Sequence, residues 1–346
     1  MKHRKICIQA AEQISVQQPL SSEWMRSPIA YRAPYVRSVD PDFKKFFSPS
    51  EARRIGKMLK RALVTSLEVI RKSGVTHPAA IITGTGLGCI ENTELFLDAL
   101  CREGERLLKP TYFMQSTHNT IGSLIGIYTK TYGYNVTYAH KGISFDSALL
   151  DAWTQFGLGL IDSALVGGHD EMTPSYFTLL QKTGFVGRNE EIGGECAVSV
   201  MLNGNARDGL CFLSGIKLIY KPTVRRLQTM LSGLLAEAGI TMRDVDAVMT
   251  GISGNKSNDA CYRKVASELF GDIPLLHFKR VFCESYTASG LGLYAAACCL
   301  RAGVIPRFLY IDQAQAVTHR PRFILLFNQC DGKNYSFILL EALCGN

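Results

Sequence analysis

One stretch of the chain, residues 136–152, constrains the fold most tightly. It reads V-T-Y-A-H-K-G-I-S-F-D-S-A-L-L-D-A, a β-branched and aromatic run, then a short turn, then an apolar periodic segment. This pattern predicts a strand, a tight turn at Gly142 and a helix. A second apolar strand follows and ends in Gly167 and Gly168. A glycine between a strand and a helix is usually a turn residue that supplies a positive φ, so Gly142 alone has an ordinary structural explanation.

The rest of the chain alternates between strand and helix patterns. Ser48, Pro49 and Glu51 form a capping box that opens one long amphipathic helix through Ile70. Further helices are predicted over residues 92–102, 116–132, 224–238, 259–270 and 288–300. Strands are predicted over 5–10, 79–88 (running into a glycine-rich turn), 196–202, 211–219 and 244–250, near Leu275, and from Phe323 and Tyr335. The alternation predicts an α/β fold with parallel sheets covered on both faces.

Composition is that of an ordinary globular protein. The 346 residues are 47 % apolar and 20 % charged, which allows about two domains, each with its own core. No apolar run is long enough to span a membrane, and the N-terminus lacks the apolar region of a signal peptide. The 11 cysteines are scattered without C-x-x-C or zinc spacing, so free thiols in the cytoplasm are expected and no metal is.

The net charge of +8 leaves two interpretations open. Basic residues gather over 44–61 and 217–226. They are either solvated helix faces or a docking surface for an acidic partner. No basic and aromatic interleaving or recognition motif is visible, so nucleic acid is not expected as a ligand. The glycine-rich turn at 84–88 lacks the lysine or acidic residue that phosphate-binding motifs carry.

The unit around Gly142 resembles the nucleophile elbow of the β-ketoacyl synthases of the thiolase superfamily. In that family a Cys at the turn precedes the two glycines of a V-x-G-G strand, and here Gly142 stands 25 residues before Gly167. The family's thiolate takes an acyl group from a carrier thioester and is activated at a helix N-terminus. Gly142 has no side chain that can do this.

Two further segments resemble motifs of the same family. Residues 248–259 are similar to H-G-T-G-T-P-x-N-D: Asn258 and Asp259 match, as does Gly254, and the His falls on Gly251. Residues 279–290 are similar to K-x-x-x-G-H-x-x-G-A-x-G: Lys279 matches and the His falls on Glu284. In the family the two His side chains stabilise developing negative charge. Gly251 has no donor, and an ionised Glu284 would repel an enolate.

The last motif, residues 327–334, resembles the C-terminal G-F-G-G-x-N turn. Gly332 and Asn334 match, and the gating Phe falls on Cys330. The resemblance spans roughly residues 6–340 and implies an α/β, thiolase-like duplicated αβαβα five-layer fold. It implies halves over 1–205 and 206–346, no cofactor, and no ketosynthase chemistry, because three catalytic positions change together.

A silent member of this family resembles the chain-length factors of type II polyketide systems, such as those that make aryl polyenes and flexirubins. The resemblance implies an active β-ketoacyl synthase as partner in a heterodimer, or a homodimer, and an acyl carrier protein as ligand. Dimers of this fold join through the strand before the elbow, here residues 135–140. Acyl-tunnel candidates are Ile90, Thr93, Leu97, Phe113 and Thr117.

An enzyme with a rearranged site is the main alternative. An acyltransferase or condensing enzyme could be built on His118, His140, His169 or Cys283, since His titrates near neutrality and Cys is a nucleophile. Glu284 beside Cys283 should raise the pKa of that thiol, which disfavours it. Residues 169–171 (His-Asp-Glu) alternate faces on a strand and are a poor metal site. A homodimeric protein that only binds acyl carrier protein is a third possibility.

Overall fold

The computed structural model describes residues 5–184, 190–206 and 208–343. In these ranges ten strands form one mixed sheet in the order β3-β2-β4-β5-β1-β6-β10-β9-β7-β8. Strand bounds are β1 Ile6–Ile14, β2 Ala80–Gly84, β3 Tyr134–Tyr138, β4 Ser163–Asp170, β5 Cys196–Asn203, β6 Cys211–Tyr220, β7 Ala247–Thr250, β8 Leu275–His277, β9 Phe323–Cys330 and β10 Asn334–Ala342. All ten coincide with or overlap the strands predicted from the sequence.

The strand order repeats within the chain. The first five strands run β3-β2-β4-β5-β1, and the last five run β8-β7-β9-β10-β6 in the corresponding sequence. A short antiparallel pairing of β1 with β6 joins the two groups. This repeat supports a duplicated architecture; the division at residues 205 and 206 stays a prediction.

The sheet is mixed, so the prediction of parallel sheets was wrong in part. β2 pairs in parallel with β3 and β4, and β7 pairs in parallel with β8 and β9. The pairs β4–β5, β1–β5, β1–β6, β6–β10 and β9–β10 are antiparallel. Alternation of strands and helices predicts parallel pairs only where a helix links two neighbouring strands, and β9 and β10 are linked by a tight turn instead.

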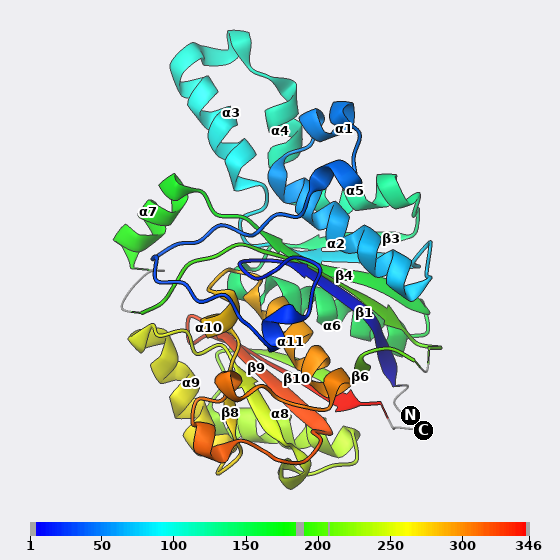
Figure 1. Cartoon of the computed structure of the whole chain (residues 1–346), viewed down its shortest axis with the longest axis vertical. Coiled ribbons are helices and arrows are strands. Elements are labelled where there is room, and N and C mark those ends of the chain that lie inside the picture. Colours follow the sequence, from blue (N-terminus) through cyan, green and yellow to red (C-terminus); the bar gives the residue numbers. More distant parts are fainter. Residues whose placement is uncertain (1–4, 185–189, 207, 344–346) are drawn as a thin grey trace.

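Helices form three layers around the two strand groups (Figure 1). Helices α2 (Lys57–Ser73) and α5 (Thr120–Thr129) cover the outer face of the first group, and α8 (Val224–Glu237) and α9 (Lys256–Leu269) that of the last group. Between the groups lie α6 (Ser144–Gly157) and α11 (Ala288–Ala302). Nearly every residue of α11 is buried, because sheet covers it on both sides.

Some predicted helix bounds needed correction. The long helix from Ser48 is two helices, α1 (Pro49–Arg54), with the predicted capping box, and α2, because Ile55 and Gly56 are extended. The helix predicted over 116–132 is α5, preceded by α4 (Pro110–Ser116). Helix α3 (Ile90–Glu103) matches its prediction, while α7 (Pro174–Thr183) and α10 (Lys279–Phe282) lie where none was predicted. No helix in the described ranges is long and apolar enough to cross a membrane.

Candidate functional site

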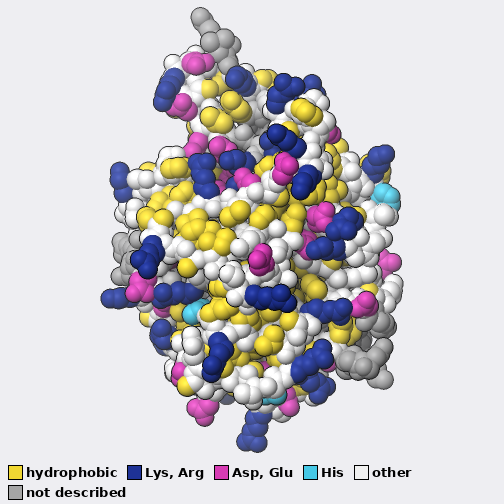
Figure 2. All heavy atoms as spheres, viewed as in Figure 1, with side chains coloured by type: hydrophobic (Ala, Val, Ile, Leu, Met, Phe, Trp, Pro, Cys, Tyr) yellow, Lys and Arg dark blue, Asp and Glu magenta, His cyan; other side chains and the backbone are white. Residues whose placement is uncertain are grey.

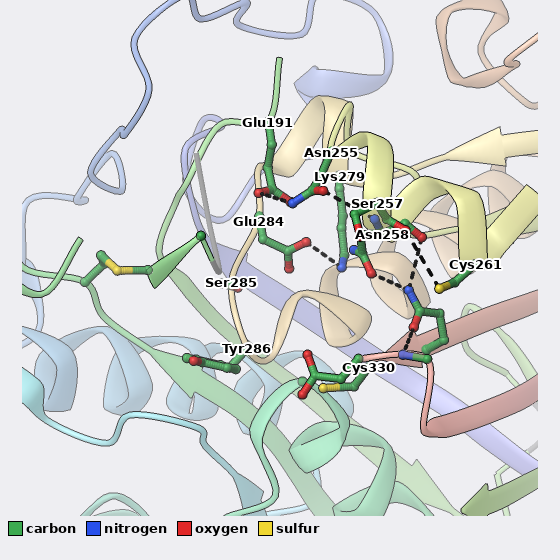
Figure 3. Close-up of a pocket in the computed structure, with 16 residues that line it drawn as sticks. Glu191, Asn255, Ser257, Asn258, Cys261, Lys279, Glu284, Ser285, Tyr286 and Cys330 are labelled. Atoms are coloured by element: carbon green, nitrogen blue, oxygen red, sulfur yellow. Dashed lines mark hydrogen bonds and ion pairs between the residues drawn. The ribbon is translucent and has the colours of Figure 1, made fainter. Parts of the chain in front are cut away.

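A cavity of about 300 Å³ lies where the elbow meets the ends of the last strand group (Figure 3). Its walls come from the elbow, the loop after β7, the segment between α10 and α11, and the turn after β9. The lining residues are Gly142, Met172, Gly184, Glu191, Asn255, Ser257, Asn258, Cys261, Lys279, Glu284, Ser285, Tyr286, Gln329, Cys330, Asp331 and Gly332. The cavity therefore brings together Gly142, Glu284 and the position of the gating Phe, as the motifs predict.

The elbow has the predicted strand, turn and helix, and its glycine is not there to supply a positive φ. Strand β3 leads into a 3-10 turn over Lys141–Ile143 and then α6. The residue with positive φ is Lys141, at 47°, whereas Gly142 is not in the left-handed region. The ordinary explanation of Gly142 as a left-handed turn residue is therefore wrong.

Space around Gly142 is taken by Cys330. A Cβ placed on Gly142 would lie 3.1 Å from the Cys330 Sγ, which is tighter than ordinary van der Waals contact. Asn328 Nδ2 donates to the Gly142 carbonyl at 3.0 Å and fixes the turn against β9. The thiol stays protonated at neutral pH, because burial raises the pKa of Cys330 to about 11. The sulfur thus crowds the space where the family's nucleophile would begin and would have to shift by a few tenths of an ångström to admit a side chain.

At Gly251 the space is filled completely. A Cβ there would clash with the Tyr262 hydroxyl, would lie 2.8 Å from Tyr262 Cζ, and would lie 3.0 Å from Lys279 Cε. Tyr262 is buried on α9, and its hydroxyl donates to Asn328 Oδ1 at 2.9 Å. No side chain fits at position 251 unless Tyr262 moves.

Glu284 is held by an ion pair. Its Oε2 lies 2.7 Å from the Lys279 Nζ, and both side chains are largely buried. Figure 3 shows the two groups pointing toward each other. Burial raises the pKa of Glu284 to about 7, with the Lys279 ammonium opposing the shift. The carboxylate is thus engaged by Lys279 rather than free to act alone, which modifies the expectation of a simple repelling anion.

The retained motif residues hold the loops of the cavity. Asp259 accepts hydrogen bonds from the Ser253 and Gly254 N–H groups at 2.9 and 3.0 Å. Asn258 accepts from Gln329 Nε2. Gly332 has φ 62° in the turn between β9 and β10, where a left-handed conformation favours glycine. Asn334 is the first residue of β10.

The glycine-rich turn at 84–88 is explained by close packing and by a buried carboxylate. A Cβ on Gly84 would lie 2.5 Å from the Ser144 backbone of α6, and one on Gly86 would lie 2.5 Å from the Tyr286 Cγ. Asp170 accepts from the Gly86 and Leu87 N–H groups. Burial raises the pKa of Asp170 to about 6. A carboxylate already uses the N–H groups that a phosphate would need, and the sequence alone did not single out this role.

The four residues of the alternative site do not converge. His118 is exposed, and His140 is also exposed, with its Nδ1 3.2 Å from the Ser147 Oγ. His169 is buried, and burial lowers its pKa to about 3, so it is neutral. Burial, followed by the effect of Glu284, raises the pKa of Cys283 to about 12. None of the four is among the residues that line the cavity.

The five tunnel candidates are not gathered in one cavity of this chain. Ile90 is half-buried and packs against a small apolar cluster, whereas Thr93, also half-buried, donates to the Cys89 carbonyl. Leu97 and Phe113 are exposed, at 50 and 57 %. Phe113 and Thr117 line a separate surface groove of about 870 Å³. In the ranges that the structure describes, no group of three or more His, Cys, Asp or Glu residues could hold a metal ion.

Residues 23–215 match the family model of the β-ketoacyl synthase N-terminal domain. This match covers more than half of the chain, and the chain therefore belongs to the β-ketoacyl synthase family. The resemblance drawn from the four motifs is confirmed at this level. No curated protein matches the chain.

Solved structures share the fold. The ishigamide ketosynthase/chain length factor has a TM-score of 0.80 at 17 % identity and covers 98 % of this chain and 99 % of that one. A β-ketoacyl synthase from Burkholderia phymatum has a TM-score of 0.79 at 12 % identity, covering 99 and 100 %. The ketosynthase ApeO in complex with its chain length factor ApeC, from Xenorhabdus doucetiae, has a TM-score of 0.75 at 16 % identity, covering 98 % of each. The prediction of a thiolase-like five-layer fold is confirmed.

Proposed function

We propose that this chain is a ketosynthase-like subunit that is silent in condensation, pairs with an active β-ketoacyl synthase and shapes the acyl tunnel of that partner during chain elongation. The observation that carries the proposal is the filling of the catalytic positions. Cys330 takes the space at Gly142, Tyr262 takes the space at Gly251, and Glu284 is paired with Lys279. A site in which other side chains occupy these positions has no place for a nucleophile with two His donors.

The free edge of the sheet supports a partner. Strand β3 is at one end of the strand order, and its residues are exposed or half-buried. An unpaired strand edge is a template for pairing with another chain. Two of the structurally similar proteins are a ketosynthase/chain length factor and a ketosynthase in complex with its chain length factor. This supports a synthase as the partner of this chain. A second copy of this chain is the competing occupant.

An acyl carrier protein is the proposed ligand of the pair. The groove of about 870 Å³ is lined by apolar side chains that include Ile55 and Ile127, and Arg53, Arg54 and Lys109 also line it. These cations suit an acidic protein. Figure 2 shows Lys and Arg scattered over the viewed face among acidic side chains, rather than as one continuous basic surface. That distribution favours a local protein contact over nucleic acid, which selects an extended basic patch.

A reducing location such as the cytoplasm fits the cysteines. Among the described residues, several cysteines, including Cys89, Cys196 and Cys299, are buried free thiols. Free buried thiols are typical of proteins kept in a reducing compartment.

Coexpression with a Cys-bearing synthase encoded beside this chain tests the proposal. The pair is purified through a tag on this chain, incubated with acyl carrier protein thioesters and examined by size exclusion and intact mass spectrometry. We expect both chains to elute together and only the synthase to gain an acyl mass. Acylation of this chain in the absence of the synthase, or failure of the two chains to copurify, would show the proposal to be wrong.

A separate measurement, the length of the product made by the copurified pair, tests whether this subunit shapes the tunnel. Ile90 and Thr93 lie half-buried at the start of α3 and are the proposed length-setting positions. Ile90→Ala and Thr93→Phe should shift the product of the copurified pair toward longer and shorter chains respectively. Glu103→Gln, an exposed change at the end of the same helix, is the matched control. An unchanged product distribution in both variants would remove these residues from the tunnel.

A further inference from the structure

Tyr286 lies between the cavity and a neighbouring cluster of apolar side chains. It lines the cavity described above, and it also packs against the apolar cluster of Leu87, Met172, Phe177 and Leu180. Met172 is the other residue shared by the cavity and the cluster. In Figure 3 Tyr286 and Cys330 both lie below the pair of Glu284 and Lys279, and the Tyr286 side chain points away from Cys330. The ring is therefore part of the wall that separates the cavity from the cluster.

The Tyr286 side chain packs closely against the backbone of the glycine-rich turn at Gly86. Gly86 lies so close that a Cβ there would be 2.5 Å from the Tyr286 Cγ and 2.9 Å from its Cδ2. The Gly86 N–H donates to both carboxylate oxygens of Asp170, at 2.9 and 3.0 Å, which holds the turn in place. A ring packed this closely on a hydrogen-bonded turn has little room to move, so it forms a fixed part of the cavity wall.

The cavity and the cluster differ in chemistry. The cavity, at about 300 Å³, is at the small end of ligand pockets, and its wall mixes apolar side chains with polar ones, including Asn258, Lys279 and Glu284. The cluster that Tyr286 also contacts is apolar, and Ile90 of α3 packs against it. A hydrocarbon chain placed in the cavity as it stands would lie against the ion pair of Lys279 and Glu284, which disfavours it.

We propose that Tyr286 closes this cavity to acyl chains, and that a small side chain at position 286 joins cavity and cluster into a binding site for a medium-length fatty acyl thioester. The inference rests on the proposed function, in which this subunit shapes the tunnel of its partner and holds no acyl chain of its own. Removing a large, half-buried ring that packs on an apolar cluster leaves an apolar space that apolar ligands can enter.

Calorimetric titration of the full chain with decanoyl-pantetheine and acetyl-pantetheine tests the proposal. Wild-type protein should show no preference for the decanoyl over the acetyl thioester. Tyr286→Ala should bind decanoyl-pantetheine at least about tenfold more tightly than wild type does, with acetyl binding unchanged. Tyr286→Leu is a second variant that keeps an apolar side chain in the wall while removing the ring, and it should show a smaller gain.

Two control variants test whether any gain in binding comes from loss of the Tyr286 ring in the cavity wall. Tyr286→Phe keeps the ring and should behave as wild type does. Tyr176→Ala removes an equally large ring from the border of the cluster but not from the cavity wall, and should leave decanoyl binding unchanged. Thermal unfolding of each variant reports whether it is folded.

Two results would overturn the proposal. One is a decanoyl preference already present in wild type, and the other is no gain in either folded variant, Tyr286→Ala or Tyr286→Leu. Both are independent of the copurification test, because the titration uses this chain alone. A silent partner with an open cavity would pass the copurification test and fail this one, so the two failures are distinguishable.

Discussion

The two strand groups of this molecule share one topology but treat their outer edges differently. At the edge of the last group, β8 is covered by its own chain: Leu276 forms an antiparallel bridge with Tyr310, and the Ile311 N–H donates to the Leu275 carbonyl at 2.9 Å. At the corresponding edge of the first group, β3 pairs with β2 and, among the described residues, no strand lies beyond it. Proteins usually protect free edges. An edge left open in one copy of a repeated layout is available for pairing with another chain, as the proposed function requires.

A charged side chain placed on the β3 edge and one placed on the β8 edge should have different effects on association and on stability. The loss of association is the largest effect expected. Val136→Lys on β3 should weaken association with the partner by at least about 2 kcal/mol, or roughly thirtyfold in Kd. The change in Tm should be small, because Val136 is only half-buried and is not among the described residues that pack against the core clusters of the first strand group. Analytical ultracentrifugation and thermal unfolding measure the two quantities.

The matched variant on the covered edge should show the opposite pattern. Leu275 on β8 is half-buried and packs against the core cluster of the last strand group. Leu275→Lys should lower the free energy of unfolding by about 1–3 kcal/mol, because it buries a charge inside the folded chain, and should leave association unchanged. Equal losses of association in both variants would show that β3 is not a special edge.

The next largest effect is expected at Gly251 in the last strand group, where Tyr262 leaves no room for a side chain. Gly251→Ala should reduce the free energy of unfolding by about 2 kcal/mol, because its Cβ meets the buried Tyr262 ring. In a Tyr262→Phe background the cost should fall by about 1 kcal/mol, since the hydroxyl that clashes is gone. Chemical denaturation of the four proteins in the cycle measures this coupling.

The control for that cycle is Gly233 on α8, where an added Cβ meets no atom within 4 Å. Gly233→Ala should stabilise the protein by about 0.5–1 kcal/mol, because alanine is the better helix residue. Additive costs for Gly251→Ala and Tyr262→Phe would mean that Tyr262 does not fill the position of the lost His.

A smaller effect is expected where the two strand groups meet. Gly142→Cys should cost about 1 kcal/mol, because its Cβ would lie 3.1 Å from the Cys330 Sγ, and the cost should vanish in Cys330→Ala. Intact mass spectrometry should show that the double variant accepts an acyl group from a carrier thioester but does not condense it, because Gly251 and Glu284 supply no imidazole. Acylation of the single and double variants at equal rates would show that Cys330 does not obstruct the site.

Much of the fold and the identity of the altered positions could be predicted from the sequence. The elbow, the β9–β10 turn and the retained Asn258 and Asp259 are local patterns, in which residue type and spacing reflect the backbone directly. The residues that fill the lost positions could not be predicted, because Cys330 is 188 positions from Gly142. Only the tertiary fold brings them together, and the same holds for Tyr286 and Gly86.

Helix predictions failed for a related reason. The apolar period continues from α1 into α2, yet Gly56 is extended and its N–H donates to the Gln115 side chain, which also bonds to the Arg54 carbonyl. A contact from α4 thus interrupts a helix whose local pattern is continuous. Periodicity reports which residues face the core and cannot report a break that a distant side chain stabilises.

The last expected effect is a pH dependence of stability, to which Glu171 of the first strand group contributes. Glu171, buried after β4, accepts from the Glu91 N–H at the start of α3, and burial raises its pKa to about 7 from an ordinary 4.5. Between these values the folded state binds more protons than the unfolded state, so stability falls as the pH rises. The loss should be about 1 kcal/mol between roughly pH 6 and pH 7.

Glu171→Gln keeps the acceptor oxygen and should remove the contribution of Glu171, whereas the exposed Glu103→Gln should leave the dependence unchanged. Denaturant unfolding across the pH range measures both slopes. In the last strand group, burial raises the pKa of Glu284 to about 7 as well, even with the Lys279 ammonium opposing the shift, so part of the slope should survive in Glu171→Gln. If Glu171→Gln left the slope unchanged, the carboxylate that anchors α3 would be ionised throughout this pH range and would add nothing to it.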